Sequence, residues 1–161
     1  MNNNSANDPI LDFDNQLTNA IKESLAKIGV ALNRINANIE EYSQNKDTET
    51  ALEKLDELYN GNTDIYDWAD SFSEQEKSVL LILYYTGSRI PYSTLPNDTI
   101  KRRNDVIQIA QDYTCDWFAL DAAKSDTKDD CFRNYITCGG TPSKKNIELS
   151  LSELGIPFQK A

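Results

Sequence analysis

Carboxylates and thiols are the side chains of this chain that could carry a reaction, because its 161 residues include no histidine. Histidine is the commonest general base and metal ligand, and it is the usual partner of a serine or cysteine nucleophile. Its absence excludes most hydrolase designs. Two carboxylates can still act as acid and base, as in glycosidases, but among 26 acidic residues such neighbours arise by chance. We therefore predict no catalytic residues and no enzyme activity.

The cysteines form neither a metal motif nor a disulfide framework. Cys115, Cys131 and Cys138 are an odd number without a C-x-x-C pair, whereas a zinc site needs four ligands. If residues 131–138 form one helix, about 10.5 Å of helical rise separates Cys131 from Cys138, which is beyond the reach of a disulfide. We expect thiols, no metal and no cofactor, in a reducing compartment such as the cytoplasm.

The strongest chemical feature is an acidic stretch, residues 40–76. It holds twelve carboxylates against only Lys46 and Lys54, a local charge of −10 that equals the net charge of the whole chain. A pI near 4.4 repels nucleic acids and anionic lipids and speeds the encounter with basic partners. The stretch is either a docking face for a basic partner or a solvated surface that keeps the protein soluble.

Helical phasing divides this stretch into two outward faces. A helix over residues 48–59 turns its leucines inward, and the like charges that it places at i,i+4 cost roughly 0.2 to 0.5 kcal/mol a pair. A short helix over residues 63–72 sets a tyrosine among aspartates, a composition typical of interface hot spots. Trp68 and Phe72 lie on its inward side. The candidate partner-binding residues are Glu49, Glu53, Asp56 and Glu57 on the first face and Asp64, Tyr66, Asp67 and Asp70 on the second.

A long N-terminal helix must position these faces. Apolar residues step by 4, 3, 4, 3, 4 and 3 from Ile21 to Tyr42, which is the spacing of a coiled-coil seam or of a long bundle helix. Extended to residues 12–44, this helix is roughly 50 Å long. Its flanks are rich in asparagine rather than in opposed charges, which favours packing within one chain over a dimeric coiled coil.

The rest of the chain is also helical in pattern, without strand alternation or repeats. Ser73 and Glu76 form a capping box that begins a helix, residues 88–96 form a loop with two prolines, and Ser143 caps the last helix. We expect the helix over residues 97–124 to be the buried centre, because apolar residues cover more than half of its circumference. The helices predicted after the first cover residues 48–59, 63–72, 73–87, 97–124, 126–138 and 143–155.

These features predict an all-α fold, a single-domain helical bundle of about six or seven helices built around the long N-terminal helix. We expect residues 1–9 to be disordered, which leaves residues 10–161 as a single α-helical domain. No apolar run of about 20 residues could span a bilayer, and no signal peptide is readable, so we expect no membrane partner.

A second interpretation rests on residues 73–113, which resemble helix-turn-helix DNA-binding modules. A capped helix is followed by a short turn and by a longer helix that opens with Lys101, Arg102 and Arg103, and the resemblance implies that these contact phosphates and base edges. The acidic charge of the chain disfavours nucleic acid. Residues 83–90 also resemble the segment of tyrosine recombinases that carries their first catalytic arginine, but the chain lacks that family's histidine and later arginine motif.

The leading hypothesis is a non-enzymatic acidic binding protein of the cytoplasm that docks on and inhibits a basic protein partner, as an immunity protein, an antitoxin or a phage-type inhibitor does. The alternatives are a helix-turn-helix regulator and a structural or assembly protein that uses the heptad helix of residues 21–42. If that helix packs within one chain the protein is a monomer, and if it packs between chains the protein is a dimer. The sequence leaves both open.

Overall fold

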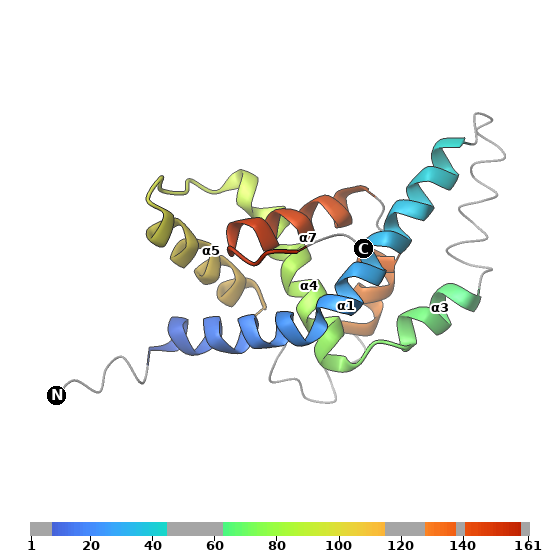
Figure 1. Cartoon of the computed structure of the whole chain (residues 1–161), viewed down its shortest axis with the longest axis horizontal. Coiled ribbons are helices and arrows are strands. Elements are labelled where there is room, and N and C mark those ends of the chain that lie inside the picture. The colour runs from blue at the N-terminus through green and yellow to red at the C-terminus, as the bar shows by residue number, and fades with distance from the viewer. Residues whose placement is uncertain (1–7, 45–62, 115–127, 138–140, 159–161) are drawn as a thin grey trace.

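The computed structural model of the protein describes residues 8–44, 63–114, 128–137 and 141–158, with side chains for residues 8–34, 67–112, 128–133, 135–136 and 143–158. The elements within these ranges are helices and none is a strand, which confirms the predicted all-α bundle. The helix predicted over residues 48–59 lies outside the described ranges. The elements are α1 (Pro9–Gln44), α3 (Thr63–Asp70), α4 (Glu74–Arg89), η3 (Ile90–Tyr92), α5 (Thr99–Thr114), η5 (Phe132–Thr137) and α7 (Thr141–Glu153) (Figure 1).

α1 begins earlier than predicted, because Asp8 and Pro9 form a helix start signal. The Asp8 carboxylate accepts a hydrogen bond from the backbone N–H of Ile10 at 2.9 Å, and Pro9 takes the first helical position, where its missing N–H costs nothing. The described part of the heptad seam packs against other helices of the same chain. Its buried residues are Ile21, Ile28 and Leu32. No helix that the structure describes is long and apolar enough to cross a bilayer.

α4 is the buried centre of the bundle. The five residues from Val79 to Leu83 are each at most 1% exposed, and α4 packs against α1, α5 and α7. Figure 1 shows α7 crossing in front of α4, with α5 and α1 on either side. The described part of the helix predicted over residues 97–124 is less covered than predicted, since Ile100 in α5 is 73% exposed; residues 115–124 lie outside the described ranges. Long-range packing, which periodicity does not report, decides which apolar helix is covered.

The predicted capping box begins α4, and the helix ends two residues beyond the predicted stop near Gly87. Ser73 and Glu76 exchange the two hydrogen bonds of the box, and the helix then runs through Gly87 to Arg89. Gly87 is buried where α7 crosses: an added Cβ would lie 2.0 Å from the backbone oxygen of Asn146. This glycine therefore serves close helix packing rather than helix termination.

The connection from α4 to α5 is more regular than the predicted loop. It opens with the single turn of η3, and the Asp98 carboxylate caps α5 by accepting the N–H of Lys101 at 3.0 Å. The described part of α5 ends at Thr114, so the rest of the helix predicted up to residue 124 lies outside the described ranges.

The last described segments are helical, as predicted, but they begin differently. Residues 128–131 form an α-helical turn that continues as the π-helix η5. Ser143 does not cap α7, which starts at Thr141; its buried hydroxyl donates to the backbone oxygen of Tyr135 instead. The predicted stop at Gly155 is confirmed. Gly155 has a φ of 72°, and its N–H reaches the Ser152 oxygen at 3.1 Å, as in a Schellman motif.

Candidate functional site

Only part of the predicted acidic surface has described side chains. Glu49, Glu53, Asp56 and Glu57 lie outside the described residues, and Asp64 and Tyr66 lie on α3 without described side chains. Asp67 and Asp70 are exposed, as the phasing predicted. Trp68 is half-buried, packs against the core and meets the Phe72 ring edge-on at 5.2 Å, in agreement with its predicted inward position.

The fold extends this surface with carboxylates from a segment that the sequence reasoning did not include. Residues 128–137 pack against α3 and α4, and they bring Asp129 and Asp130 to the turn where α3 gives way to α4. The consecutive aspartates were visible in the sequence, but no local pattern joins them to residues more than fifty positions earlier. We call the resulting cluster the acidic corner. It consists of Asp67, Asp70, Glu74, Glu76, Asp129 and Asp130.

The cations of this region lie beneath the carboxylates. Lys77 and Lys128 are 5% and 1% exposed. Lys77 binds Asp129 at 2.9 Å, and Lys128 donates to the Glu74 carboxylate and the Glu74 backbone oxygen, each at 3.0 Å, and to the Ser78 hydroxyl at 3.1 Å. All three protons of the Lys128 ammonium thus have acceptors, which its burial requires.

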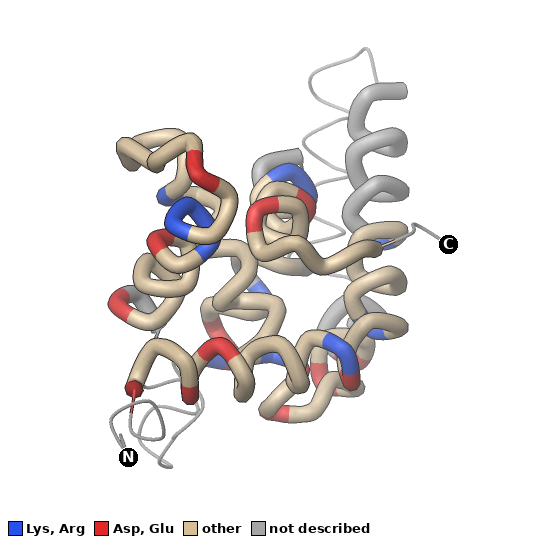
Figure 2. Tube along the Cα trace, turned by 60° about the vertical axis from the view of Figure 1, so that its left-hand side comes forward, with Lys and Arg blue, Asp and Glu red and all other residues tan. Residues whose placement is uncertain are grey.

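A third cation, Arg133, is only half-buried and joins the acidic corner from the side. Its guanidinium binds the Asp70 carboxylate at 2.9 Å, and this hydrogen bond raises the pKa of Arg133. A fourth cation, Lys27 on α1, reaches the Ser71 backbone oxygen at 3.5 Å, so six carboxylates against four cations leave the acidic corner with a net charge of −2. Along α5 and α7 acidic and basic positions are interspersed, whereas the first turns of α1 carry only acidic ones (Figure 2).

Glu74 is the carboxylate most closely tied to the buried lysines. Partial burial acts to raise the pKa of Glu74, but the hydrogen bond and charge of Lys128, together with Lys77, lower it below its ordinary value. Its side chain nevertheless remains 54% exposed. Glu74 therefore stays ionised at neutral pH and can present negative charge to the solvent while it holds Lys128.

The three residues of the DNA-binding interpretation have different surroundings. Arg102 forms a two-point ion pair with Glu153 at 2.7 and 3.0 Å. Arg103 binds both oxygens of Asp14 at 2.8 and 2.9 Å, and its Nε donates to the Leu154 backbone oxygen. Lys101 is exposed. Two of the three cations are therefore engaged in joining α5 to α7 and α1, and one faces the solvent.

An aromatic cluster lies beside the described thiol, which contacts Tyr85, and the sequence reasoning did not foresee it. The rings of Tyr84 and Tyr135 stack at 5.5 Å with 19° between their planes, and the Tyr85 ring meets Tyr135 at 6.0 Å. Burial, reinforced by a hydrogen bond with Cys131, raises the pKa of Tyr85. Cys131 is not in a disulfide. The cluster joins α4 to residues about fifty positions later, so it carries no local sequence signal.

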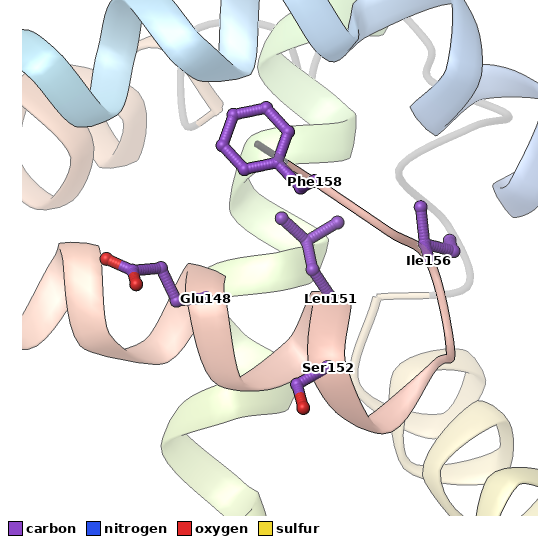
Figure 3. Close-up of a pocket in the computed structure, with 5 residues that line it drawn as sticks. All are labelled: Glu148, Leu151, Ser152, Ile156 and Phe158. Carbon is purple, nitrogen blue, oxygen red and sulfur yellow. The ribbon is translucent and has the colours of Figure 1, made fainter. Parts of the chain in front are cut away.

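Two hollows flank Phe158, in the segment after α7; the one on the α7 side is lined in part by Glu148 and Ser152. Figure 3 shows its ring above Leu151, with Ile156 beside it. The hollow on the α7 side has a volume of about 210 Å³, and the one on the α1 side, lined by Leu25 and Val30, has about 400 Å³. The larger value falls within the usual range of ligand pockets. Its lining is apolar apart from Asn33, so it offers few groups to orient a polar ligand.

Metal ligands do not come together in the described ranges, where no three Cys, Asp or Glu side chains are placed to hold an ion.

Comparisons with known proteins found no relative, so the site is interpreted from its geometry. No protein family, no curated protein and no solved structure matches the chain.

Proposed function

We propose that this protein acts by binding, and that its acidic corner docks on a basic surface of a protein partner and blocks it, in the manner of an immunity protein, an antitoxin or a phage-type inhibitor. The observation that carries this proposal is that the carboxylates of the acidic corner lie outside and its lysines Lys77 and Lys128 lie buried beneath them. Carboxylates from three segments meet at one corner and face the solvent, while Lys77 and Lys128 lie beneath them. A partner therefore meets negative charge first, which speeds encounter and selects cationic surfaces.

Trp68 stands between Asp67 and Asp70; its ring packs inward against the core, and only its exposed part is open to a partner. Aromatic side chains supply much of the energy of protein interfaces, and surrounding charges mainly supply orientation and association rate. We propose a cytoplasmic setting, and the unbridged thiol of Cys131 supports it because disulfides are rare in reducing compartments.

The test uses a partner captured from the native cell, purified and then titrated with variants. Asp67→Lys combined with Asp130→Lys should weaken binding at least about tenfold, because close charge pairs across interfaces couple by about 1.5 kcal/mol or more. Both residues are exposed, so the fold should not change. Glu23→Lys on α1 alters net charge by the same amount per residue at another exposed position and serves as the control. Affinity within twofold of wild type for the double variant would refute the acidic corner as the site.

A further inference from the structure

One carboxylate of the acidic corner is held by two ammonium groups at once. The Oε1 atom of Glu74 lies 3.6 Å from the Lys77 nitrogen, and its Oε2 atom lies 3.0 Å from the Lys128 nitrogen. Because each oxygen contacts a different lysine, the orientation of the carboxylate is fixed as well as its position. The side chain is nevertheless 54% exposed. Glu74 is therefore open to the solvent and restrained at the same time.

Lys77 also joins this carboxylate to a second one from a distant part of the chain. Its nitrogen lies 2.9 Å from the Oδ1 atom of Asp129, so oxygens of Glu74 and Asp129 both lie within 3.6 Å of the same ammonium. Glu74 begins α4, whereas Asp129 lies in the turn that leads into η5, more than fifty residues later. The shared lysine therefore sets the spacing between the two carboxylates.

The two lysines are themselves fixed by burial. Lys77 is 5% and Lys128 is 1% exposed, and the Lys128 ammonium also donates to the Glu74 backbone oxygen at 3.0 Å and to the Ser78 hydroxyl at 3.1 Å. A buried ion pair is often no more stabilising than apolar side chains of similar volume. The distinctive contribution of these ammonium groups is therefore the geometry that they impose on the carboxylates.

Fixed carboxylates bind a cation with a smaller loss of conformational freedom than mobile ones. Ordering one long side chain at an interface weakens the affinity by about two- to tenfold. A carboxylate has about four lone-pair sites, so an oxygen that a lysine contacts from beneath can still accept a hydrogen bond from a partner's guanidinium or ammonium group.

We infer that Lys77 and Lys128 are positioning residues of the acidic corner, which hold Glu74 and Asp129 in the arrangement that cations of the basic partner bind. This inference rests on the proposed function and adds which residues organise its surface. It also predicts an effect opposite in sign to that of net charge. Replacing either lysine by methionine makes the acidic corner more negative, so charge alone predicts tighter binding, whereas loss of positioning predicts weaker binding.

NMR relaxation of side-chain methylene groups tests the positioning in the full chain without a partner. Glu74 should be nearly as ordered as a buried side chain, and in Lys128→Met its order should fall towards that of Glu23, an exposed residue on α1. Methionine keeps the volume of the buried chain, so circular dichroism should show unchanged helicity. A wild-type Glu74 as mobile as Glu23, or one that Lys128→Met leaves equally ordered, overturns the inference.

Binding kinetics give the second readout, with the partner that was captured and purified for the test of the proposed function. Lys77→Met and Lys128→Met should each raise the dissociation rate about three- to tenfold, while the association rate stays level or rises. Lys27→Met is the matched control. It removes the same charge from the acidic corner, but within the described ranges Lys27 contacts the Phe72 ring and the Ser71 backbone oxygen. It should keep the dissociation rate within about twofold of wild type.

Dissociation no faster than wild type in both buried-lysine variants overturns the inference, and so does an equally large rise in Lys27→Met. In a Glu74→Gln background, Lys128→Met should add little, because it acts through that carboxylate; additive losses would contradict this. The variant with Asp67→Lys and Asp130→Lys separates the two proposals. If it loses affinity and the buried-lysine variants do not, the acidic corner remains the docking site and only the positioning is refuted. If it binds like wild type, the proposed function itself fails.

Discussion

Gly87 lies in the interior of α4, where the absence of a Cβ lets α7 pack directly on the helix backbone. The position that a Cβ would take is 2.0 Å from the Asn146 oxygen and 2.7 Å from its Cα. Backbone atoms cannot turn aside as the end of a flexible side chain can. The distance between the two helices is thus set by one residue without a side chain.

Three glycines allow a graded test of this interpretation. Gly87→Ala should destabilise the protein by about 3 kcal/mol or more, because α4 and α7 must separate. Gly155→Ala should cost about 1 kcal/mol through its φ of 72° alone. Gly29→Ala meets only the Phe158 ring, at 3.5 Å, and should be neutral or stabilising by up to about 1 kcal/mol. Urea denaturation measures the free energy of unfolding of all three variants. If Gly87→Ala lost no more stability than Gly155→Ala, the close packing of α7 on Gly87 would be contradicted.

Lys128 offers a second test at this scale, because its charge and its volume can be removed separately. Lys128→Met keeps the buried chain, and Glu74 remains hydrated at 54% exposure, so stability should stay within about 1 kcal/mol of wild type. Lys128→Ala also leaves a cavity and should cost about 2 to 3 kcal/mol. Thermal unfolding compares the two. Equal losses would mean that the ion pair, and not the packing, stabilises this region.

At the scale of elements, the first turn of α5 ties the two neighbouring helices together. Arg102 binds Glu153 on α7, and Arg103 binds Asp14 on α1 and the Leu154 oxygen just after α7. The forked guanidinium makes these simultaneous contacts possible, because its donors lie in one plane at fixed angles. The sequence suggested a nucleic-acid contact for the same residues.

Arg103→Lys should therefore not be a conservative change. The ammonium keeps the charge but cannot reach both Asp14 oxygens and the Leu154 oxygen together, and we expect a loss of about 1 to 2 kcal/mol. Lys101→Arg, at the exposed position two residues earlier, is the matched control and should change nothing. Denaturant titration of both variants gives the comparison, and equal stability of Arg103→Lys and wild type would show that the fork is dispensable.

What could be predicted from the sequence follows from the range of each interaction. The capping box of Ser73 and Glu76 and the stop at Gly155 were predictable, because both are made by residues within a few positions of each other. Gly87 was misinterpreted because its role depends on α7, more than fifty residues later. The acidic corner was predicted only in part for the same reason, since Asp129 and Asp130 join it through tertiary packing.

For the whole molecule, the carboxylates paired with cations set how stability depends on pH. Hydrogen bonding to Arg102 lowers the pKa of Glu153 against partial burial, and Lys128 with Lys77 lowers that of Glu74 against its own burial. The folded protein therefore binds fewer protons than the unfolded chain near and below the ordinary value of 4.5. This contribution is fully present above 4.5 and is lost as the pH falls.

The unfolding temperature should accordingly be level near neutral pH and fall as the pH drops through about 4.5 and below. Glu153→Gln removes one of the described carboxylates whose pKa is lowered, so it should lower the unfolding temperature near neutral pH and make that temperature fall less steeply in acid. A series of thermal melts from about pH 7 to about pH 3 checks this. A wild-type profile whose acid slope is unchanged in Glu153→Gln would show that other carboxylates control acid unfolding.

The covering of α4 by α7 has a consequence for synthesis in the cell. α4, whose central residues are buried, is complete at Arg89, but the helix that packs on Gly87 is complete only at Glu153. At about 5 to 20 residues per second, a ribosome needs roughly 3 to 13 s to cover that distance. During this interval a nascent chain exposes Val79 to Leu83 without their final cover, and it is then a substrate for chaperones.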